Sequence, residues 1–186
     1  SVTIAALKEA GITEMVAAST GNVAISYSAY ASRAGMKLWA FVTSLVPAVK
    51  MREIALYGSQ VIKITGSYDQ CKQVAAEFAR QRKLYLDMGA RTITSIEAMK
   101  TIAFEIAEQL TNALGPGENS QLRTPDWYVQ AISGGMGPIG VHKGFREMQQ
   151  MGWVDKIPAF APIQAEGCAP MVESWKKGLA KAEPVT

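Results

Sequence analysis

The chain has 186 residues, of which 48% are hydrophobic and 19% are charged, and its formal net charge is +3. These values are typical of a globular protein with enough apolar material for one large domain or two small lobes. The basic residues are scattered and no apolar run reaches the roughly 18 residues of a membrane helix, so we expect neither a nucleic-acid nor a membrane partner.

Four apolar segments in the first half begin near residues 13, 37, 60 and 84, and therefore recur every 23 or 24 residues. Their composition and their Gly, Ser or Thr boundaries predict strands, and helical patterns fill the intervals. Such a series predicts parallel pairing with right-handed crossovers. The predicted strands are "TEMVAAS", "KLWAFVT", "QVIKITG" and "LYLDMG", separated by helices over 22–35, 47–58 and 67–83.

The second half begins with a long helical pattern at 95–114, followed by a loop at 115–125. Two further strand-then-helix units start at "WYVQAI" and "AFAPIQAEG". We therefore expect an α/β fold with open parallel twisted sheets and flanking helices. Residues 1–95 would form a small four-strand βαβ lobe, and residues 96–186 part of a larger lobe.

The stretch "SGGMGPIG", residues 133–140, holds four glycines between a predicted strand and a predicted helix. Backbone N–H groups and the helix dipole favour an anion at such a junction, and glycine lets a phosphate approach the main chain. Pro138 has no N–H but suits a first helical turn. Gly134, Gly135, Met136 and Gly137 are thus a candidate phosphate site. A tight turn without a ligand is the simpler interpretation.

Residues 135–140, "GMGPIG", also match the G-x-G-x-x-G pattern of dinucleotide sites. Glu166 would end the next strand, where a ribose-binding acid is expected. An NAD-binding oxidoreductase domain is therefore an alternative.

A second loop, "ASTGNVA" at 18–24, also follows a strand and opens a helix. Ser19, Thr20 and Asn22 can bond ligand oxygens, and Gly21 permits close approach. Helix capping alone also explains these residue types. Both loops fall at the carboxyl ends of strands, where ligands collect in parallel sheets.

The motifs "ASTGN", "EAMKTIAFEIAEQL", "HKGF" and "IQAEGCAPMV", in this order, resemble the tryptophan-synthase-β superfamily of pyridoxal-phosphate enzymes, and within it the threonine synthases. The resemblance covers nearly the whole chain. It implies a lyase of amino-acid biosynthesis that converts O-phospho-L-homoserine and water to L-threonine and phosphate. The whole enzyme would be a cytoplasmic homodimer that acts on a small amino-acid phosphate.

The resemblance also implies residue roles. Ser19, Thr20, Gly21 and Asn22 match the loop that receives the substrate carboxylate, and Asn22 matches a residue near the pyridoxal 3′-oxygen. Gly134, Gly135, Met136 and Gly137 match the loop that binds the cofactor phosphate. The small lobe would close over the substrate and exclude water.

Three departures from the family stand in the sequence, which reads "GGMGP", "EAMKT" and "GARTITSIE" where threonine synthases usually have G-N-x-G-N, E-G-Q-K-T and Asn-Pro-x-Arg. A cysteate synthase-like replacement on O-phosphoserine is therefore a second alternative. The family's Ser-Phe-Lys-Asp-Arg motif, which carries the Schiff-base lysine, is not present. We expect a central portion of a longer enzyme that is inactive alone, or else a non-catalytic binding module.

Other side chains fit structural roles. Lys100 and Lys143 are expected at the surface, and His142 has no acid to orient it as a base. Cys168 is expected to be a buried thiol, and the two cysteines and one histidine give no metal site. The four tryptophans are expected in core and edge packing: Trp39, Trp127, Trp153 and Trp175.

Overall fold

The computed structural model describes residues 2–19, 21–132 and 134–183. The chain divides into two compact units, Ser1–Ser95 and Ile96–Thr186. Each unit carries a parallel sheet with flanking helices, which confirms the predicted fold class. Within the described ranges, no helix has both the length and the apolarity needed to cross a bilayer.

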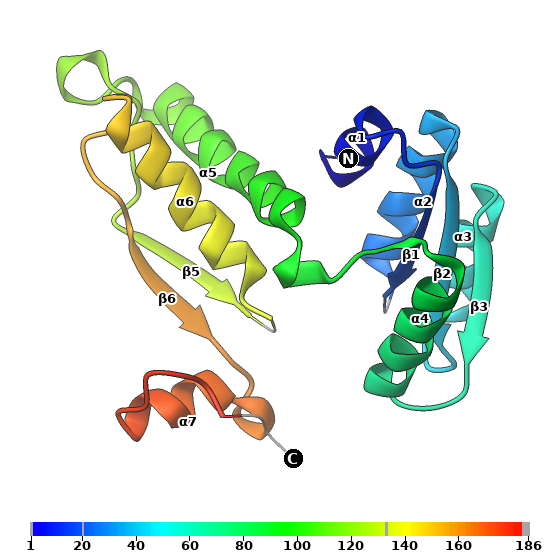
Figure 1. The fold of residues 1–186 in the computed structure, drawn as a ribbon. Helices are drawn as coiled ribbons and strands as arrows, with labels where there is room; N and C mark the ends of the chain where they lie inside the picture. The colour runs from blue at the N-terminus through cyan, green and yellow to red at the C-terminus, as the bar shows by residue number, and fades with distance from the viewer. Residues whose placement is uncertain (1, 20, 133, 184–186) are drawn as a thin grey trace. The chain divides into compact units, whose positions relative to one another are not determined.

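The first unit is built on a four-stranded parallel sheet with the order β3-β2-β1-β4, of which Figure 1 labels the first three strands. β1 is paired on both sides, with Val16 opposite Trp39 of β2 and Leu86 of β4. A central parallel strand is covered on both faces, which explains its continuous apolar sequence. The strands are β1 (Glu14–Ala18), β2 (Lys37–Thr43), β3 (Gln60–Ile64) and β4 (Tyr85–Leu86).

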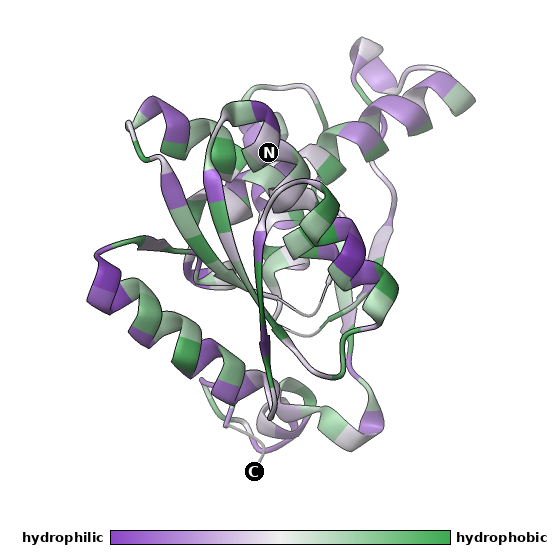
Figure 2. Ribbon diagram, turned by 90° about the vertical axis from the view of Figure 1, so that its right-hand side faces the viewer, coloured by the Kyte–Doolittle hydropathy of each residue, from purple (hydrophilic) through white to green (hydrophobic). Residues whose placement is uncertain are grey.

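Helices cover both faces of this sheet. Because side chains alternate along a strand, Met15 and Ala17 join a core with the first three helices, whereas Val16 packs with Cys71 on the opposite face. Bands of opposite hydropathy alternate along the helices in Figure 2, as expected for helices with one buried side. The helices are α1 (Val2–Glu9), α2 (Asn22–Ala34), α3 (Ala48–Leu56) and α4 (Tyr68–Arg82).

The second unit has a two-stranded parallel sheet of β5 (Trp127–Ala131) and β6 (Ala159–Ile163). One face packs against α5 (Ile93–Leu114) and α6 (Met136–Gln150), where Phe145 and Met148 are buried. A short helix, α7 (Pro170–Lys176), follows β6. The described residues also include the 3-10 turns η1 (Gly89–Arg91), η2 (Glu118–Ser120) and η3 (Glu166–Cys168).

The tryptophans correct one prediction. Trp39 is half-buried and donates a hydrogen bond to Glu14 Oε2 at 2.9 Å. Trp127, Trp153 and Trp175 instead have exposed fractions of 64%, 53% and 80%. A single strand or helix pattern does not reveal which of its faces lacks a partner, so sequence reasoning placed these rings in packed positions.

Candidate functional site

The first candidate loop joins β1 to α2 at the carboxyl edge of the four-stranded sheet. Ser19 is buried, and its hydroxyl accepts hydrogen bonds from the N–H groups of Gly21 at 3.2 Å and Ala24 at 3.3 Å. Ser19 therefore accepts the N–H of Ala24 in the first turn of α2 from two residues before the N-cap, which is Gly21. Gly21 has φ 145°, a conformation that favours glycine. Thr20 lies outside the described residues.

Lys50 lies beside this loop and was not found from the sequence. Its Nζ donates a 2.8 Å hydrogen bond to Asn22 Oδ1, and a Cβ placed on Gly21 would lie 2.8 Å from Lys50 Cδ. The contact forms because β1 and β2 are neighbours, so their following helices begin at one sheet edge. A lysine in the first turn of α3 opposes the helix dipole, which is the signal that could have identified it.

Tyr68 fixes the end of β1 that leads into the loop. Its hydroxyl donates a 3.2 Å hydrogen bond to the carbonyl oxygen of Ala18. Burial raises the pKa of Tyr68, which keeps the hydroxyl protonated and able to donate. Ser67 and Gln70 form a capping box that sets the start of α4, and so places Tyr68.

The second candidate loop joins β5 to α6 in the other unit. Gly135 is the N-cap of α6, with φ 75°, and a Cβ on Gly134 would meet no atom within 4 Å. A Cβ on Gly137 would lie 2.5 Å from Gln130 Nε2, so only glycine fits there without movement. The first-turn N–H groups, including those of Met136 and Gly137, have no carbonyl partner within the helix. Ser133 lies outside the described residues.

Close packing on α5 positions α6. A Cβ on Gly140 would lie 2.7 Å from the carbonyl oxygen of Ile96, and one on Gly144 would lie 2.9 Å from that of Lys100. Two glycines four residues apart thus let the helix backbones approach each other. The third glycine of a dinucleotide site instead packs a helix onto a strand. The position of Gly140 therefore does not favour the dinucleotide alternative.

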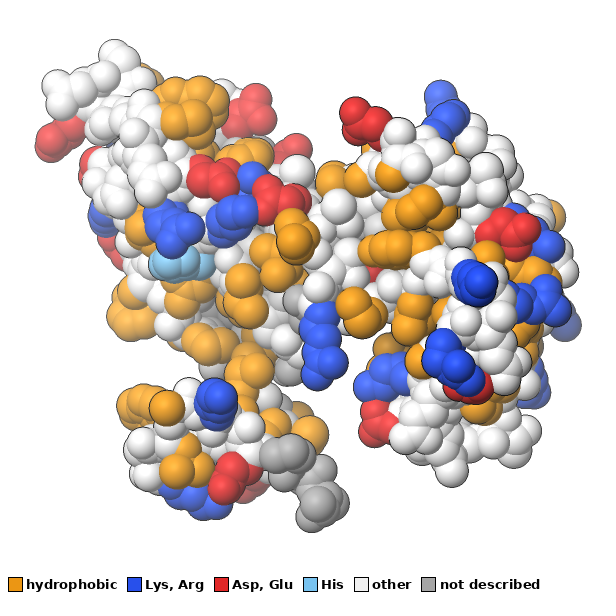
Figure 3. All heavy atoms as spheres, in the orientation of Figure 1, with side chains coloured by type: hydrophobic (Ala, Val, Ile, Leu, Met, Phe, Trp, Pro, Cys, Tyr) orange, Lys and Arg blue, Asp and Glu red, His pale blue; other side chains and the backbone are white. Residues whose placement is uncertain are grey.

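An alternating cluster of charges joins the same two helices. Lys100 Nζ lies 2.5 Å from Glu97 Oε2 and 2.8 Å from Glu147 Oε2, and Lys143 also pairs with Glu97. The side chains of Lys100 and Lys143 are 18% and 34% exposed, so both are partly buried but still reach the surface. Acidic and basic side chains lie next to one another over α5 and α6 in Figure 3. These ion pairs hold α6, which follows the glycine loop, against α5, and we call them the clamp.

The segment after β6 lies against the glycine loop. Gln164 Oε1 accepts hydrogen bonds from the N–H groups of Met171 and Val172, and so caps α7. A Cβ on Gly135 would lie 3.4 Å from Cε of Met171. Met171, in the motif "IQAEGCAPMV", therefore lies next to the glycine loop within this unit.

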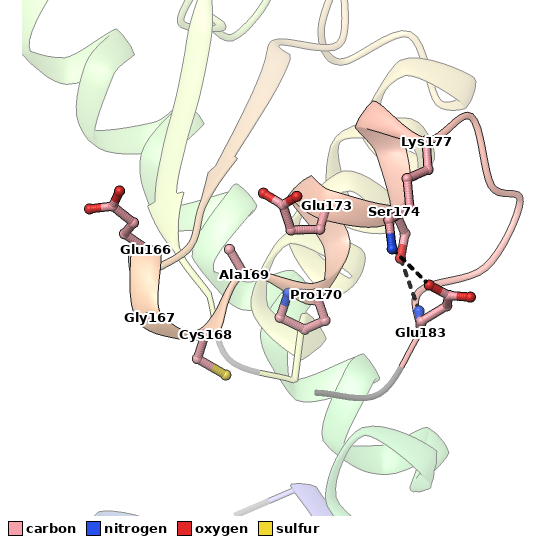
Figure 4. A pocket seen from close by; sticks show the side chains of 9 residues that line it. All are labelled: Glu166, Gly167, Cys168, Ala169, Pro170, Glu173, Ser174, Lys177 and Glu183. Atoms are coloured by element: carbon pink, nitrogen blue, oxygen red, sulfur yellow. Dashed lines mark hydrogen bonds and ion pairs between the residues drawn. The ribbon is translucent and has the colours of Figure 1, made fainter. Parts of the chain in front are cut away.

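A cavity of about 240 Å³ opens beside α7 (Figure 4). Ser174 Oγ accepts the N–H of Glu183 at 2.9 Å, and the carboxylate of Glu183 pairs with Lys177 at 3.2 Å. Cys168 lines the cavity and is exposed, contrary to the expected buried thiol, because η3 projects from the end of the sheet. Across the described part of the chain, no three His, Cys, Asp or Glu side chains gather as a metal site.

His142 does not join either loop. It is exposed on α6, and its ring contacts the edge of Phe160 with the centroids 5.3 Å apart. This agrees with the expected surface role.

Parallel α/β units with a glycine stretch at a helix N-terminus are typical of proteins that bind a phosphorylated cofactor on backbone N–H groups. The family described as "Pyridoxal-phosphate dependent enzyme" matches residues 1–186, and the chain belongs to this family. Its cofactor is pyridoxal phosphate, as the resemblance implied.

Several similar curated proteins are threonine synthases. The chain is 29% identical over 178 residues to that of Methanocaldococcus jannaschii, covering 95% of this chain and 41% of the relative. It is 34% identical over 187 residues to that of Bacillus sp. (strain ULM1), covering 98% and 47%. The chain thus spans less than half the length of these relatives.

Solved structures show the same fold. Maize serine racemase matches with a TM-score of 0.77 and 20% identity, over 99% of this chain and 51% of its own. The processed form of threonine deaminase isoform 2 from Solanum lycopersicum matches with a TM-score of 0.71 and 18% identity, over 92% and 43%. At these identities the likeness concerns the fold alone.

Proposed function

We propose that this chain is the cofactor- and substrate-binding part of a lyase resembling threonine synthase, acting on O-phospho-L-homoserine. The observation that carries the proposal is the glycine stretch 134–137, which opens α6 in a chain similar to threonine synthases over 95% of its length. Open space at Gly134, and first-turn N–H groups that have no carbonyl partner within the helix, would suit the phosphate of the cofactor.

Bound pyridoxal phosphate supplies an electron sink for carbanions at substrate carbons. In this proposal, the N–H groups of Met136 and Gly137 bind its phosphate oxygens. The loop at Ser19–Asn22 receives the substrate carboxylate, with the charge of Lys50 beside it. Because the sequence lacks the family's Ser-Phe-Lys-Asp-Arg motif, we also propose that the chain alone binds without converting substrate.

Equilibrium dialysis with pyridoxine 5′-phosphate tests the proposal, since this alcohol analogue cannot react with lysines. We expect saturable binding of pyridoxine 5′-phosphate, and at least about tenfold weaker binding of unphosphorylated pyridoxine. Gly134→Asp should weaken binding of the phosphorylated analogue to a similar extent, because it places a negative charge in the loop at Gly134–Gly137. Gln150→Glu, at the other end of α6, is the matched control and should bind as the parent chain does. Equal binding of both analogues, or saturable binding of NADH in their place, would refute the proposal.

The substrate is tested with the same protein. O-phospho-L-homoserine should bind more tightly than O-phospho-L-serine, and Lys50→Met should weaken it. Preference for O-phospho-L-serine would instead favour the cysteate synthase-like alternative.

A further inference from the structure

Gln130 is a polar residue on the inner face of β5. Side chains alternate along a strand, so Gln130 lies on the same face as Tyr128, which packs on the core formed with α5 and α6. Gln130 is half-buried, and a polar group in such a position costs free energy unless a hydrogen bond or a ligand compensates for it. An apolar side chain would pack there at lower cost, so packing alone does not explain the amide.

Tyr128 fixes the orientation of this amide. Its hydroxyl donates a 2.8 Å hydrogen bond to Gln130 Oε1. Burial raises the pKa of Tyr128, so the hydroxyl stays protonated and able to donate. Oε1 thus has its partner, whereas the two N–H groups of Nε2 are left for another acceptor. Among the described residues, Nε2 donates no hydrogen bond.

The amide of Gln130 lies against the first turn of α6. A Cβ on Gly137 would lie 2.5 Å from Gln130 Nε2 and 2.6 Å from Oε1, so the amide occupies the space in front of that glycine. The Cα–Cβ bonds of a helix tilt toward its N-terminus. The amide therefore lies on the N-terminal side of Gly137, where the free N–H groups and the helix dipole favour an anion. Gln130 is also the last residue but one of its strand, at the carboxyl end where ligands of parallel sheets collect.

The first turn of α6 has one backbone donor fewer than usual. Pro138 is the third residue of the helix and has no N–H, which leaves the N–H groups of Met136 and Gly137 within this turn. A phosphate monoester presents three strong acceptor oxygens to its surroundings. A side-chain donor beside Gly137 would therefore offset the donor that Pro138 lacks.

We propose that Gln130 Nε2 is a further hydrogen-bond donor to the phosphate of the cofactor, and that Tyr128 is a positioning residue that acts through Gln130. The inference rests on the proposed phosphate site at Gly134–Gly137 and adds to it a contact from outside the glycine stretch. It also explains why residue 137 is glycine, since any side chain there would displace the amide.

Binding of two pyridoxine analogues to the chain tests the inference. Gln130→Met removes the donor but keeps the length of the side chain. It should weaken binding of pyridoxine 5′-phosphate about tenfold, as expected for a lost hydrogen bond to a charged group, and leave binding of pyridoxine unchanged. Gln149→Met is the matched control and should bind as the parent does, since it removes a glutamine that bonds the Asp155 carbonyl oxygen beyond the other end of α6.

The outcomes separate this inference from the proposed function. A parent chain that does not prefer the phosphorylated analogue would overturn both. A parent chain with that preference, and an equal preference in Gln130→Met, would overturn this inference alone.

A nuclear magnetic resonance titration of the parent chain observes the contact itself and needs no variant. The side-chain NH₂ signals of Gln130, identified by their nuclear Overhauser effects to the Tyr128 ring, should shift with pyridoxine 5′-phosphate and stay in place with pyridoxine. Signals that do not move while the phosphorylated analogue binds would overturn the proposed contact.

A double-mutant cycle tests the role of Tyr128. Tyr128→Phe should weaken binding of pyridoxine 5′-phosphate about threefold in the parent and hardly at all in Gln130→Met, because Tyr128 acts through the amide. A role of Tyr128 in packing alone would give equal losses in the two backgrounds, and that result would overturn its assignment as a positioning residue.

Discussion

The ammonium group of Lys50 donates a 2.8 Å hydrogen bond to Asn22 Oδ1, and its aliphatic part lies against Gly21. The two residues are 28 positions apart and belong to successive strand-helix units. Their contact places a positive charge at the loop that the sequence predicts to bind a carboxylate. An exposed pair of this kind contributes little to stability, so its effect should appear in anion binding.

Lys50→Met should therefore weaken O-phospho-L-homoserine binding by about tenfold at low salt, and by less at 0.15 M ionic strength, where exposed charges are screened. The urea midpoint should barely move. Isothermal titration calorimetry at the two salt concentrations measures the two affinities, and urea unfolding measures the midpoint. Lys8→Met is the control for loss of net charge. Unchanged affinity in Lys50→Met would show that this lysine does not serve the loop.

Tyr68→Phe should make the loop at Ser19–Asn22 more mobile, because Tyr68 holds the end of β1 that leads into it. The variant loses the hydroxyl that bonds the Ala18 carbonyl, at a cost of about 1 kcal/mol of unfolding free energy. Amide hydrogen exchange should rise at residues 19–24, whereas Tyr30→Phe on α2 should leave it unchanged. Exchange that rises equally throughout the first unit would indicate general destabilisation and contradict a local role for Tyr68.

Gly140→Ala should destabilise the second unit. The new Cβ would lie 2.7 Å from the Ile96 carbonyl oxygen, so α6 must move away from α5 at a cost of about 1–3 kcal/mol. Gly167→Ala is the control, since a Cβ there meets nothing within 4 Å. Urea unfolding monitored by circular dichroism measures the difference. Similar midpoints for the two variants would argue against close helix packing at Gly140.

The charge cluster predicts an acid-sensitive clamp. Hydrogen bonds from Lys100 and Lys143 hold the pKa of Glu97 below its usual range, so its stabilisation is present above the pKa of the unfolded state. That contribution is lost as the pH falls below about 4. Glu97→Gln should lower stability at pH 7 and flatten its decline at acid pH, whereas Glu108→Gln should not. Parallel curves of unfolding free energy against pH for Glu97→Gln and the parent would contradict the clamp.

The strand-helix order was predictable because β-branched runs and glycine boundaries recur at a nearly constant interval along the chain. The glycine stretch at Gly134–Gly137 was also predictable as a strand-to-helix junction, and its role as an anion site stays a prediction. Hydrogen bonds that Ser19 accepts from N–H groups at the start of α2 also agreed with its residue type. These features are local, so the neighbouring sequence contains the necessary information.

Features that depend on packing between distant segments were missed. Lys50 reaches Asn22 only because β1 and β2 pair, and Lys100 is drawn into a cluster only because Gly140 and Gly144 bring α6 close to α5. The exposure of Trp127 likewise depends on which strands and helices cover β5. The sequence pattern shows that such a residue is apolar, but not what lies opposite it.

The most direct test of the cofactor site is a nuclear magnetic resonance titration of the chain, labelled with ¹⁵N-glycine, with pyridoxine 5′-phosphate. The account predicts saturable shifts of the Gly134, Gly135 and Gly137 amides, with Gly152 at the far end of α6 unmoved. In Gly134→Asp, the shifts of the remaining Gly135 and Gly137 amides should be absent. Saturable shifts elsewhere while these three amides stay fixed would contradict it.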